Sequence, residues 1–230
     1  MPGAMSSETI HLRPNAAVAE RVLLPGDPGR ALRLAQLLTD SPRMLNHNRG
    51  LWGYTGTAAD GELLTIQATG MGGPSAAIVT EELIRLGARR LVRVGTCGAL
   101  TPALRLGDLV LAETAIPHDG ASRALGASGP LAADATLLEA LRTAAPDAHS
   151  GPVLSSDLFY DPDPTHPPEA VAIEMEAATI FAVAGQHGLP AACILAVSDI
   201  VATHARIGDE ALAAAEQALG RAAFAATSSS

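Results

Sequence analysis

The sequence lacks lysine entirely: its 230 residues include fifteen basic side chains, and all of them are arginine. A Walker-type phosphate loop requires a lysine, and so do pyridoxal and Schiff-base chemistry. These classes of protein are therefore excluded. Arginine instead suits the bidentate capture of phosphate or carboxylate groups, because its planar guanidinium presents paired N–H donors.

Cysteine, positive charge and long apolar runs are also scarce. Two cysteines, Cys97 and Cys193, in a chain of this length indicate a reduced, cytoplasmic protein without a disulfide framework. No apolar stretch reaches the roughly 18 residues that a membrane helix needs. Residues Met1–Ser7 have neither the basic start nor the apolar core of a secretion signal. The net charge of −9 argues against nucleic acid or an anionic membrane as a partner.

Nearly half of the residues, 48%, are apolar, which indicates one compact domain over residues 1–230. Apolar strands alternate with glycine-rich turns and with segments of helical periodicity. Strands are predicted at Arg21–Leu24, Leu63–Thr69, Leu91–Val94, Asp108–Ile116, Val153–Ser155 and Ala191–Val197, and helices at Arg30–Leu38, Ser75–Leu86, Asp134–Thr143, Glu176–Gln186 and Asp209–Ala226. Residues 1–7 and 227–230 are expected to be disordered. The alternation predicts an α/β fold with a central mixed sheet flanked by helices.

Ligands of such sheets gather where strands end at glycine-rich turns, and three arginines lie at or beside these turns. Arg30, Arg49 and Arg93 each adjoin a glycine segment. Arg93 also lies in an apolar run, where an unpaired charge would cost several kcal/mol, so it needs an internal carboxylate or an anionic ligand. Each arginine alone is expected to be an ordinary ion-pair residue. Together, the three arginines favour phosphate binding as strongly as they favour ordinary ion pairing.

Two acidic segments follow apolar runs. Glu174 and Glu176 stand where such a run enters a helix, so either helix-dipole chemistry or hydrogen bonding to a sugar diol explains them. Asp199 follows the apolar strand Ala192–Val197 and should be partly desolvated, which favours its protonated form and a role as a proton donor. A helix cap or a turn explains Ser198-Asp199 equally well.

Aromatic residues make up only 3% of the chain, so the adjacent Phe159 and Tyr160 are notable. A ring at this place can stack on a base, although a core Phe beside a rim Tyr is slightly favoured. The seven histidines show no metal-ligand spacing, and no metal site is expected. His11 is uninterpretable alone, and the others are interpreted as surface or core fillers: His47, His118, His149, His166, His187 and His204.

Taken in order, these segments resemble the nucleoside phosphorylases of the hexameric, bacterial purine/uridine type. The matching segments are Leu24–Arg30, Asn48–Gly50 with Gly53–Gly56, Gly70–Gly72 with Pro74-Ser75, Arg93–Gly98, Ser155–Tyr160, Glu174–Ala178 and Val197–Asp199. They span about residues 11–204. One such motif would be a weak signal, whereas seven in the order of the family are highly specific.

The resemblance implies a phosphate site and an oligomer. Gly26, Arg30, Arg93 and Thr96 match the phosphate-binding residues. Arg49 matches an arginine that reaches the phosphate of a neighbouring subunit. The family forms homohexamers built as trimers of dimers.

The resemblance also implies how the nucleoside is bound. His11, in a looser match, is similar to a histidine lent across the same interface to the sugar 5′-hydroxyl. Met175 and Glu176 match the ribose-binding residues, and Glu176 matches the carboxylate that binds the 2′- and 3′-hydroxyls. The base-binding positions match Phe159, as the stacking ring, and Cys97, Gly98 and Ser198. Asp199 occupies the position of the acid that protonates purine N7.

The activity implied is reversible phosphorolysis of purine (2′-deoxy)ribonucleosides to the free base and α-D-(deoxy)ribose 1-phosphate, with inorganic phosphate as co-substrate and no metal or organic cofactor. The uracil-specific branch is disfavoured, because Asp161–His166 lacks the Gln and Arg of that branch and Asp199 has no counterpart in it. Two departures from the family pattern concern the base-binding side of the site. The segment between Phe159 and Glu174 is shorter than usual, and Leu212 stands where purine-type members carry an acid-assisting arginine. Either Arg206 substitutes for that arginine or the assistance is absent.

Two rival functions remain. A nucleosidase would use water in place of phosphate, but related hydrolases lack the Gly-Asp-Pro-x-Arg turn, so Arg30 together with Arg93 favours a phosphorylase. A non-catalytic nucleoside-binding module is the second rival. It would have no need of an acid at Asp199.

Overall fold

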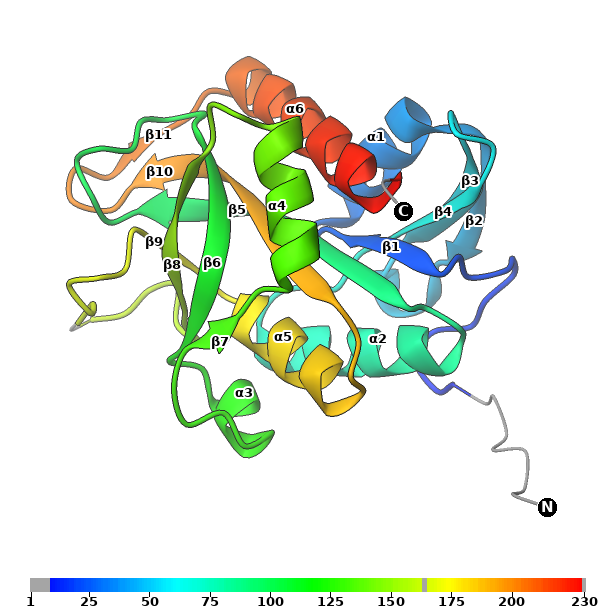
Figure 1. The fold of residues 1–230 in the computed structure, drawn as a ribbon, viewed down its shortest axis with the longest axis horizontal. Coiled ribbons are helices and arrows are strands. Elements are labelled where there is room, and N and C mark those ends of the chain that lie inside the picture. Colours follow the sequence, from blue (N-terminus) through cyan, green and yellow to red (C-terminus); the bar gives the residue numbers. More distant parts are fainter. Residues whose placement is uncertain (1–8, 163–164, 229–230) are drawn as a thin grey trace.

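The computed structural model describes residues 9–162 and 165–228, and a large mixed sheet with helices on both faces dominates it (Figure 1). The strands are β1 Arg21–Leu24, β2 Thr39–Asn46, β3 Gly53–Ala58, β4 Leu63–Gln67, β5 Arg90–Ala99, β6 Leu109–Pro117, β7 Leu131–Ala132, β8 His149–Ser155, β9 Ala172–Glu174, β10 Ala191–Ile200 and β11 Ala205–Arg206. Their order is β11-β10-β6-β8-β9-β5-β1-β4-β3-β2, with β7 beside β6. The expected α/β fold with a central mixed sheet is confirmed.

Part of this sheet closes on itself. β5 pairs with β10 in parallel and with β9 in antiparallel fashion, and β10 continues through β6 and β8 back to β9. These five strands therefore form a small closed ring, from which β1, β4, β3 and β2 extend as an open wing. β5 belongs to both parts, so the residues at its end lie where the ring and the wing meet.

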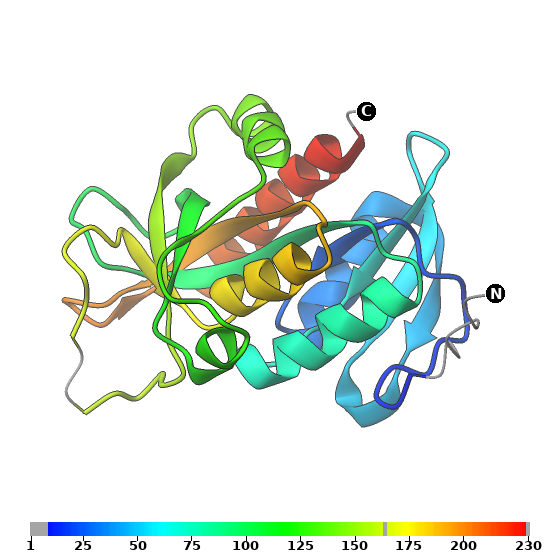
Figure 2. The same cartoon turned by 60° about the horizontal axis from the view of Figure 1, so that its bottom comes forward.

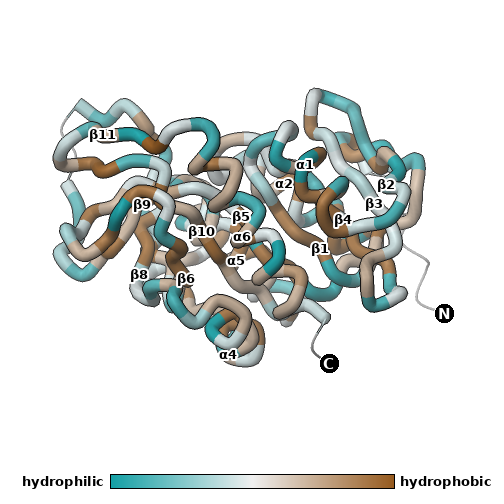
Figure 3. The backbone as a smooth tube through the Cα atoms, turned by 90° about the horizontal axis from the view of Figure 1, so that it is seen from above, coloured by the Kyte–Doolittle hydropathy of each residue, from teal (hydrophilic) through white to brown (hydrophobic). Residues whose placement is uncertain are grey.

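Six helices cover the two faces: α1 Pro28–Leu38, α2 Gly73–Arg85, α3 Gly120–Ala124, α4 Ala135–Ala144, α5 Ala177–Gln186 and α6 Asp209–Ser228. α1, α4 and α6 lie on one face, and α2, α3 and α5 lie on the other (Figures 1 and 2). The alternation along β1 explains this arrangement, since Val22 and Leu24 join the apolar core with α2 and α5, whereas Leu23 joins the core with α1 and α6. The central strands are accordingly the most hydrophobic part of the backbone (Figure 3).

Glycines explain two differences between the predicted and the observed strands, in β5 and in β3. β5 was expected to end at Val94, before a turn at Gly95–Gly98, but it runs to Ala99. β3 was not predicted because Gly53 and Gly56 resemble turn residues. A Cβ on Gly53 would lie 1.9 Å from Gln67 Oε1, and one on Gly56 would lie 2.6 Å from Thr39 Oγ1. In each case the glycine leaves room for a neighbouring side chain within the sheet.

The expected disorder at the C-terminus is wrong for residues 227–228. Helix α6 continues to Ser228, and Thr227 is buried at 1% exposure. Arg90 Nη1 donates to the carbonyl of Thr227 at 2.6 Å, and Arg21 Nη1 donates to Ser228 Oγ at 3.0 Å. These contacts fix the last turn of the helix. Residues 1–7 and 229–230, for which disorder was also expected, lie outside the described residues.

No helix within residues 9–162 and 165–228 is both long and apolar enough to cross a membrane.

Candidate active site

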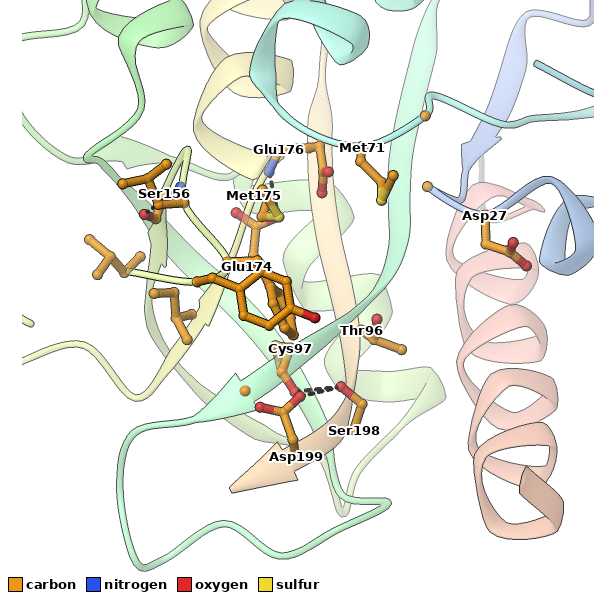
Figure 4. Close-up of a pocket in the computed structure, with 18 of the residues that line it drawn as sticks. Asp27, Met71, Thr96, Cys97, Ser156, Glu174, Met175, Glu176, Ser198 and Asp199 are labelled. Atoms are coloured by element: carbon orange, nitrogen blue, oxygen red, sulfur yellow. Dashed lines mark hydrogen bonds between the residues drawn. The ribbon is translucent and has the colours of Figure 1, made fainter. Parts of the chain in front are cut away.

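A cavity of about 820 Å³ opens at the ends of β5, β9 and β10, where the ring of strands meets the open wing. Every residue that the sequence suggested for the site lines it except His11: Gly26, Arg30, Arg49, Arg93, Thr96, Cys97, Gly98, Phe159, Met175, Glu176, Ser198, Asp199 and Arg206. Figure 4 shows Glu174 and Glu176 at one side of the cavity, Ser198 and Asp199 at another, and Asp27 beside the first turn of α1. Residues from distant parts of the chain therefore converge on one hollow.

Arg93 of β5 is buried at 3% exposure and has the internal partners that its apolar surroundings require. Its Nε donates to Glu174 Oε2 at 2.6 Å, and its Nη2 lies 2.5 Å from Glu176 Oε2. Burial alone would lower the pKa of Arg93, but Glu176 and Glu174 offset burial and hold the pKa above its ordinary value. Nη1 is buried and has no hydrogen-bond partner among the described residues.

Glu174 and Glu176 have different tasks. Glu174 accepts hydrogen bonds from Ser155 Oγ and from the backbone N–H groups of Glu176 and Ala177, so it caps the start of α5 as the helix-dipole interpretation expects. Glu176 lines the cavity, and its Oε1 accepts from the N–H of Gly72 at 2.5 Å. Burial raises the pKa of Glu176, with Arg93 opposing this shift and Glu174 adding to it.

Arg30 enters the cavity from the first turn of α1. Asp27, the N-cap of this helix, accepts from the backbone N–H of Arg30 at 2.6 Å. The Arg30 side chain is buried and donates from Nε to Glu216 Oε1 at 2.7 Å. Arg30 is held against the cavity wall by the glycine turn before α1, by the Asp27 cap and by the buried ion pair with Glu216.

Asp199 lies at the end of β10 and is half-buried. Ser198 Oγ lies 2.8 Å from Asp199 Oδ1, and a Cβ on Gly98 would come within 2.9 Å of Asp199 Oδ2. Asp199 and Arg206 are direct partners across the antiparallel pair β10–β11. Arg206 also lines the cavity, so it can act on Asp199 from this strand position.

The aromatic loop lies at the rim of the cavity. Phe159 is 59% exposed and Tyr160 is 87% exposed, and their ring centroids are 4.9 Å apart in an edge-to-face arrangement. The favoured prediction of a core Phe beside a rim Tyr is therefore wrong. Phe159 lines the cavity and its ring is exposed, so it is available to stack on a ligand.

Three histidines that were interpreted as fillers line the cavity: His118, His166 and His204. His204 has a positive φ of 57° in the turn between β10 and β11. Met71, which is 85% exposed, lines the cavity as well. The spacing of the three histidines does not distinguish them from surface side chains, whereas Met71 lies within the matching segment Gly70–Gly72. Only the fold brings the histidines to the site.

His11 lies outside the cavity. Its Nδ1 is 2.8 Å from Glu82 Oε1, and Asn48 Nδ2 donates to its carbonyl at 2.8 Å. Asn48 begins the 3₁₀ turn Asn48–Gly50 that carries Arg49, so His11 and Arg49 belong to neighbouring segments of one surface. Arg49 has a positive φ of 59°, and its side chain lines the cavity of its own chain.

No group of three or more His, Cys, Asp or Glu side chains in the described part of the chain is arranged to hold a metal ion. Cys97 and Cys193 are buried free thiols. Burial raises the pKa of both thiols.

Residues 20–228 match the family model of the phosphorylase superfamily. A protein of Exiguobacterium sibiricum described as purine nucleoside phosphorylase DeoD-type is 38% identical over 225 residues, which are 91% of this chain and 92% of that protein. A protein of Jannaschia sp. with the same description is 39% identical over 84% of this chain and 87% of its own length. A guanosine phosphorylase of Halorubrum lacusprofundi is 41% identical over 78% of each chain.

Proposed function

Since this chain belongs to the phosphorylase superfamily, we propose that it cleaves purine (2′-deoxy)ribonucleosides with inorganic phosphate, reversibly, to the free base and α-D-(deoxy)ribose 1-phosphate. The convergence of Arg30, Arg93, Glu176 and Asp199 on one cavity carries this proposal. These side chains line one cavity, and their chemistry supports phosphate binding by the arginines, sugar-diol binding by Glu176 and proton donation by Asp199. The named activities of the relatives from Exiguobacterium, Jannaschia and Halorubrum support the same reaction class.

Phosphate binds between the first turn of α1 and the end of β5 in this scheme. Arg30 and Arg93 supply guanidinium donors, Thr96 supplies a hydroxyl, and Gly26 allows close approach of the backbone. Holding the nucleophile in line with C1′ is a positioning and electrostatic effect.

The sugar and the base occupy the rest of the cavity. Glu176 accepts hydrogen bonds from the 2′- and 3′-hydroxyls beside Met175, because each of its carboxylate oxygens keeps a lone pair beyond the bonds to Gly72 and Arg93. Phe159 stacks on the purine at the rim. Cys97, Gly98 and Ser198 lie along the same wall.

Bond cleavage follows from these positions. Phosphate attacks C1′ from the face opposite the base as the C1′–N9 bond breaks through an oxocarbenium-like transition state. Asp199 gives its proton to N7, which makes the departing purine a neutral leaving group. We assign Arg206 as the group that assists Asp199 from β11, since the two residues face each other in the register. The scheme calls on no metal or organic cofactor.

We further propose that the protein assembles with copies of itself, as dimers within a hexamer, in the cytoplasm. His11 does not line the cavity of its own chain and lies beside the segment of Arg49. Apolar side chains near these segments are exposed, with Ile10 at 74% and Trp52 at 40%. In a dimer formed through this surface, His11 and Arg49 of one copy would reach the cavity of the other copy. Light scattering should then give a mass above that of one chain.

The test uses purified protein and a panel of purine and pyrimidine nucleosides, with chromatography of the released bases. We expect purine release in phosphate buffer and none in phosphate-free buffer. Equal release without phosphate would mean that water is the nucleophile and would overturn the proposal. Absence of release from every nucleoside would favour a binding module instead.

A further inference from the structure

Glu216 is a buried carboxylate on the apolar face of α6, at 3% exposure. Its neighbours on that face are small or apolar residues of α6, including Leu219 and Gly220. A charge in such surroundings is stable only when it is paired and hydrogen-bonded. Sequence reasoning did not single out Glu216, because α6 carries none of the matching motifs.

Two arginines of α1 satisfy this carboxylate, one on each oxygen. Arg30 Nε donates to Oε1 at 2.7 Å. Arg33 donates to Oε2 from Nη2 at 2.7 Å and from Nε at 3.1 Å. Arg30 and Arg33 are three residues apart on one helix, so their side chains reach Glu216 from the same face.

This contact determines which edge of the Arg30 guanidinium is available. Its Nε is occupied by Glu216, and Nη1 makes only a long contact of 3.5 Å to the carbonyl of Val94. The Nη1–Nη2 edge therefore remains for the cavity. This edge offers the paired donors that bind two oxygens of one phosphate.

The contact also sets the charge beside the phosphate. Arg30 paired with Glu216 alone would be a neutral pair, which attracts a phosphate dianion weakly. Arg33 does not line the cavity, and its side chain is 52% exposed. It nevertheless adds a second positive charge to the pair of Arg30 and Glu216. Arg30, Arg33 and Glu216 together carry one net positive charge. Asp27 also lies 3.7 Å from Arg33 Nη2, but this pair is about half exposed and is screened by water.

We propose that Glu216 is a positioning residue for the phosphate subsite, which fixes Arg30 for bidentate binding while Arg33 neutralises the charge of Glu216. The inference rests on the proposed phosphate-dependent reaction. It adds a residue from the C-terminal helix, 186 positions from Arg30 in sequence, to the determinants of phosphate affinity.

The test measures the affinity for inorganic phosphate by titration calorimetry and the KM values for phosphate and nucleoside by steady-state kinetics. Glu216→Ala should weaken phosphate binding and raise the phosphate KM by at least tenfold, while the nucleoside KM changes by less than twofold. Glu216→Gln keeps an oxygen acceptor for Arg30 Nε and should restore most of the affinity. Circular dichroism confirms that each variant is folded.

Arg33→Gln tests the charge. It should weaken phosphate binding about threefold in the wild-type background, where it leaves the charge of Glu216 uncompensated, and by a clearly smaller factor in the Glu216→Gln background, where Arg33 is only a screened surface charge. Arg221→Gln, which removes an exposed arginine from α6 itself, is the matched control and should leave phosphate affinity unchanged.

Each outcome decides between a positioning and a merely structural role. Unchanged phosphate affinity in folded Glu216→Ala would overturn the inference while leaving the proposed reaction intact, provided that wild-type turnover requires phosphate. Equal effects of Arg33→Gln in both backgrounds would overturn the charge argument. Failure of the wild-type protein to bind phosphate at all would overturn both the inference and the proposed function.

Discussion

Replacing Asp199 with asparagine removes the proposed proton donor and changes little else. The amide oxygen can still accept from Ser198 Oγ, which lies 2.8 Å from Asp199 Oδ1, and the side chain is half-buried. The substitution should therefore alter the free energy of unfolding by only about 0.5 kcal/mol. Loss of general acid catalysis should lower kcat for purine nucleosides by about 10²–10⁴-fold, which is roughly 2.7–5.4 kcal/mol of transition-state stabilisation.

A second substrate isolates the proton transfer in this experiment. A purine nucleoside methylated at N7 already carries a positive charge on its base, so that base can leave without a proton from Asp199. We expect Asp199→Asn to cleave the N7-methylated nucleoside within about threefold of the wild-type rate, while its rate on the unmethylated nucleoside collapses. Steady-state kinetics on both substrates measures the difference. Equal losses on both substrates, or no loss on either, would refute the assignment of Asp199.

Further perturbations test the packing and the charges around this site. Gly73→Ala should destabilise the fold by about 1–3 kcal/mol in urea unfolding, because its Cβ would lie 2.8 Å from the Cβ of Ala121. An unchanged unfolding midpoint would show that α2 and α3 can separate without cost. Arg21 holds the pKa of Asp60 well below its usual range. The stabilisation from this pair is present above about pH 4 and is lost as the pH falls. Asp60→Asn should thus cost roughly 0.5–1 kcal/mol at pH 7 in thermal or urea unfolding, and the difference should shrink steadily as the pH falls below about 4; a difference that stays constant down to about pH 2 would contradict this. Arg206→Gln should lower kcat/KM about two- to fivefold, as expected for loss of one exposed cross-strand charge; wild-type kinetics would show that Arg206 gives no assistance.

The alternation of strands and helices was readable from the sequence because the core strands consist mainly of apolar residues. β1 was predicted with its observed bounds, Arg21–Leu24. β2 was not, since Thr39–Asn46 contains a proline and half of its residues are exposed. It lies at the edge of the sheet, where a proline and a polar surface are tolerated.

The glycine segment after Arg93 shows how a sequence signal can be partly correct. Gly95 and Gly98 were interpreted as a turn that binds an anion, but they are strand residues of β5. A Cβ on Gly95 would lie 2.8 Å from Arg93 Cζ. The glycines therefore make space for Arg93 and for Asp199 of the neighbouring strand. The glycine motif after Arg93 therefore predicted the correct location of the site, although its structural role differs from the predicted one.

Contacts between distant segments were beyond the reach of local patterns. The charge of Arg93 in an apolar run predicted a partner, yet it did not reveal that Glu174 and Glu176 both fill this role. The contact between Glu216 and Arg30 joins residues 186 positions apart and has no local signature. Such pairs depend on the packing of α6 against α1, which only the three-dimensional structure defines.

The identity of the sugar product tests the central claim most directly. A purine nucleoside incubated with the protein and inorganic phosphate should give, in ³¹P NMR, a new sugar 1-phosphate signal that grows in proportion to the released base. Free ribose accumulating with the phosphate signal undiminished would contradict the claim, because it would show that the oxyanion held by Arg30 and Arg93 does not attack the sugar.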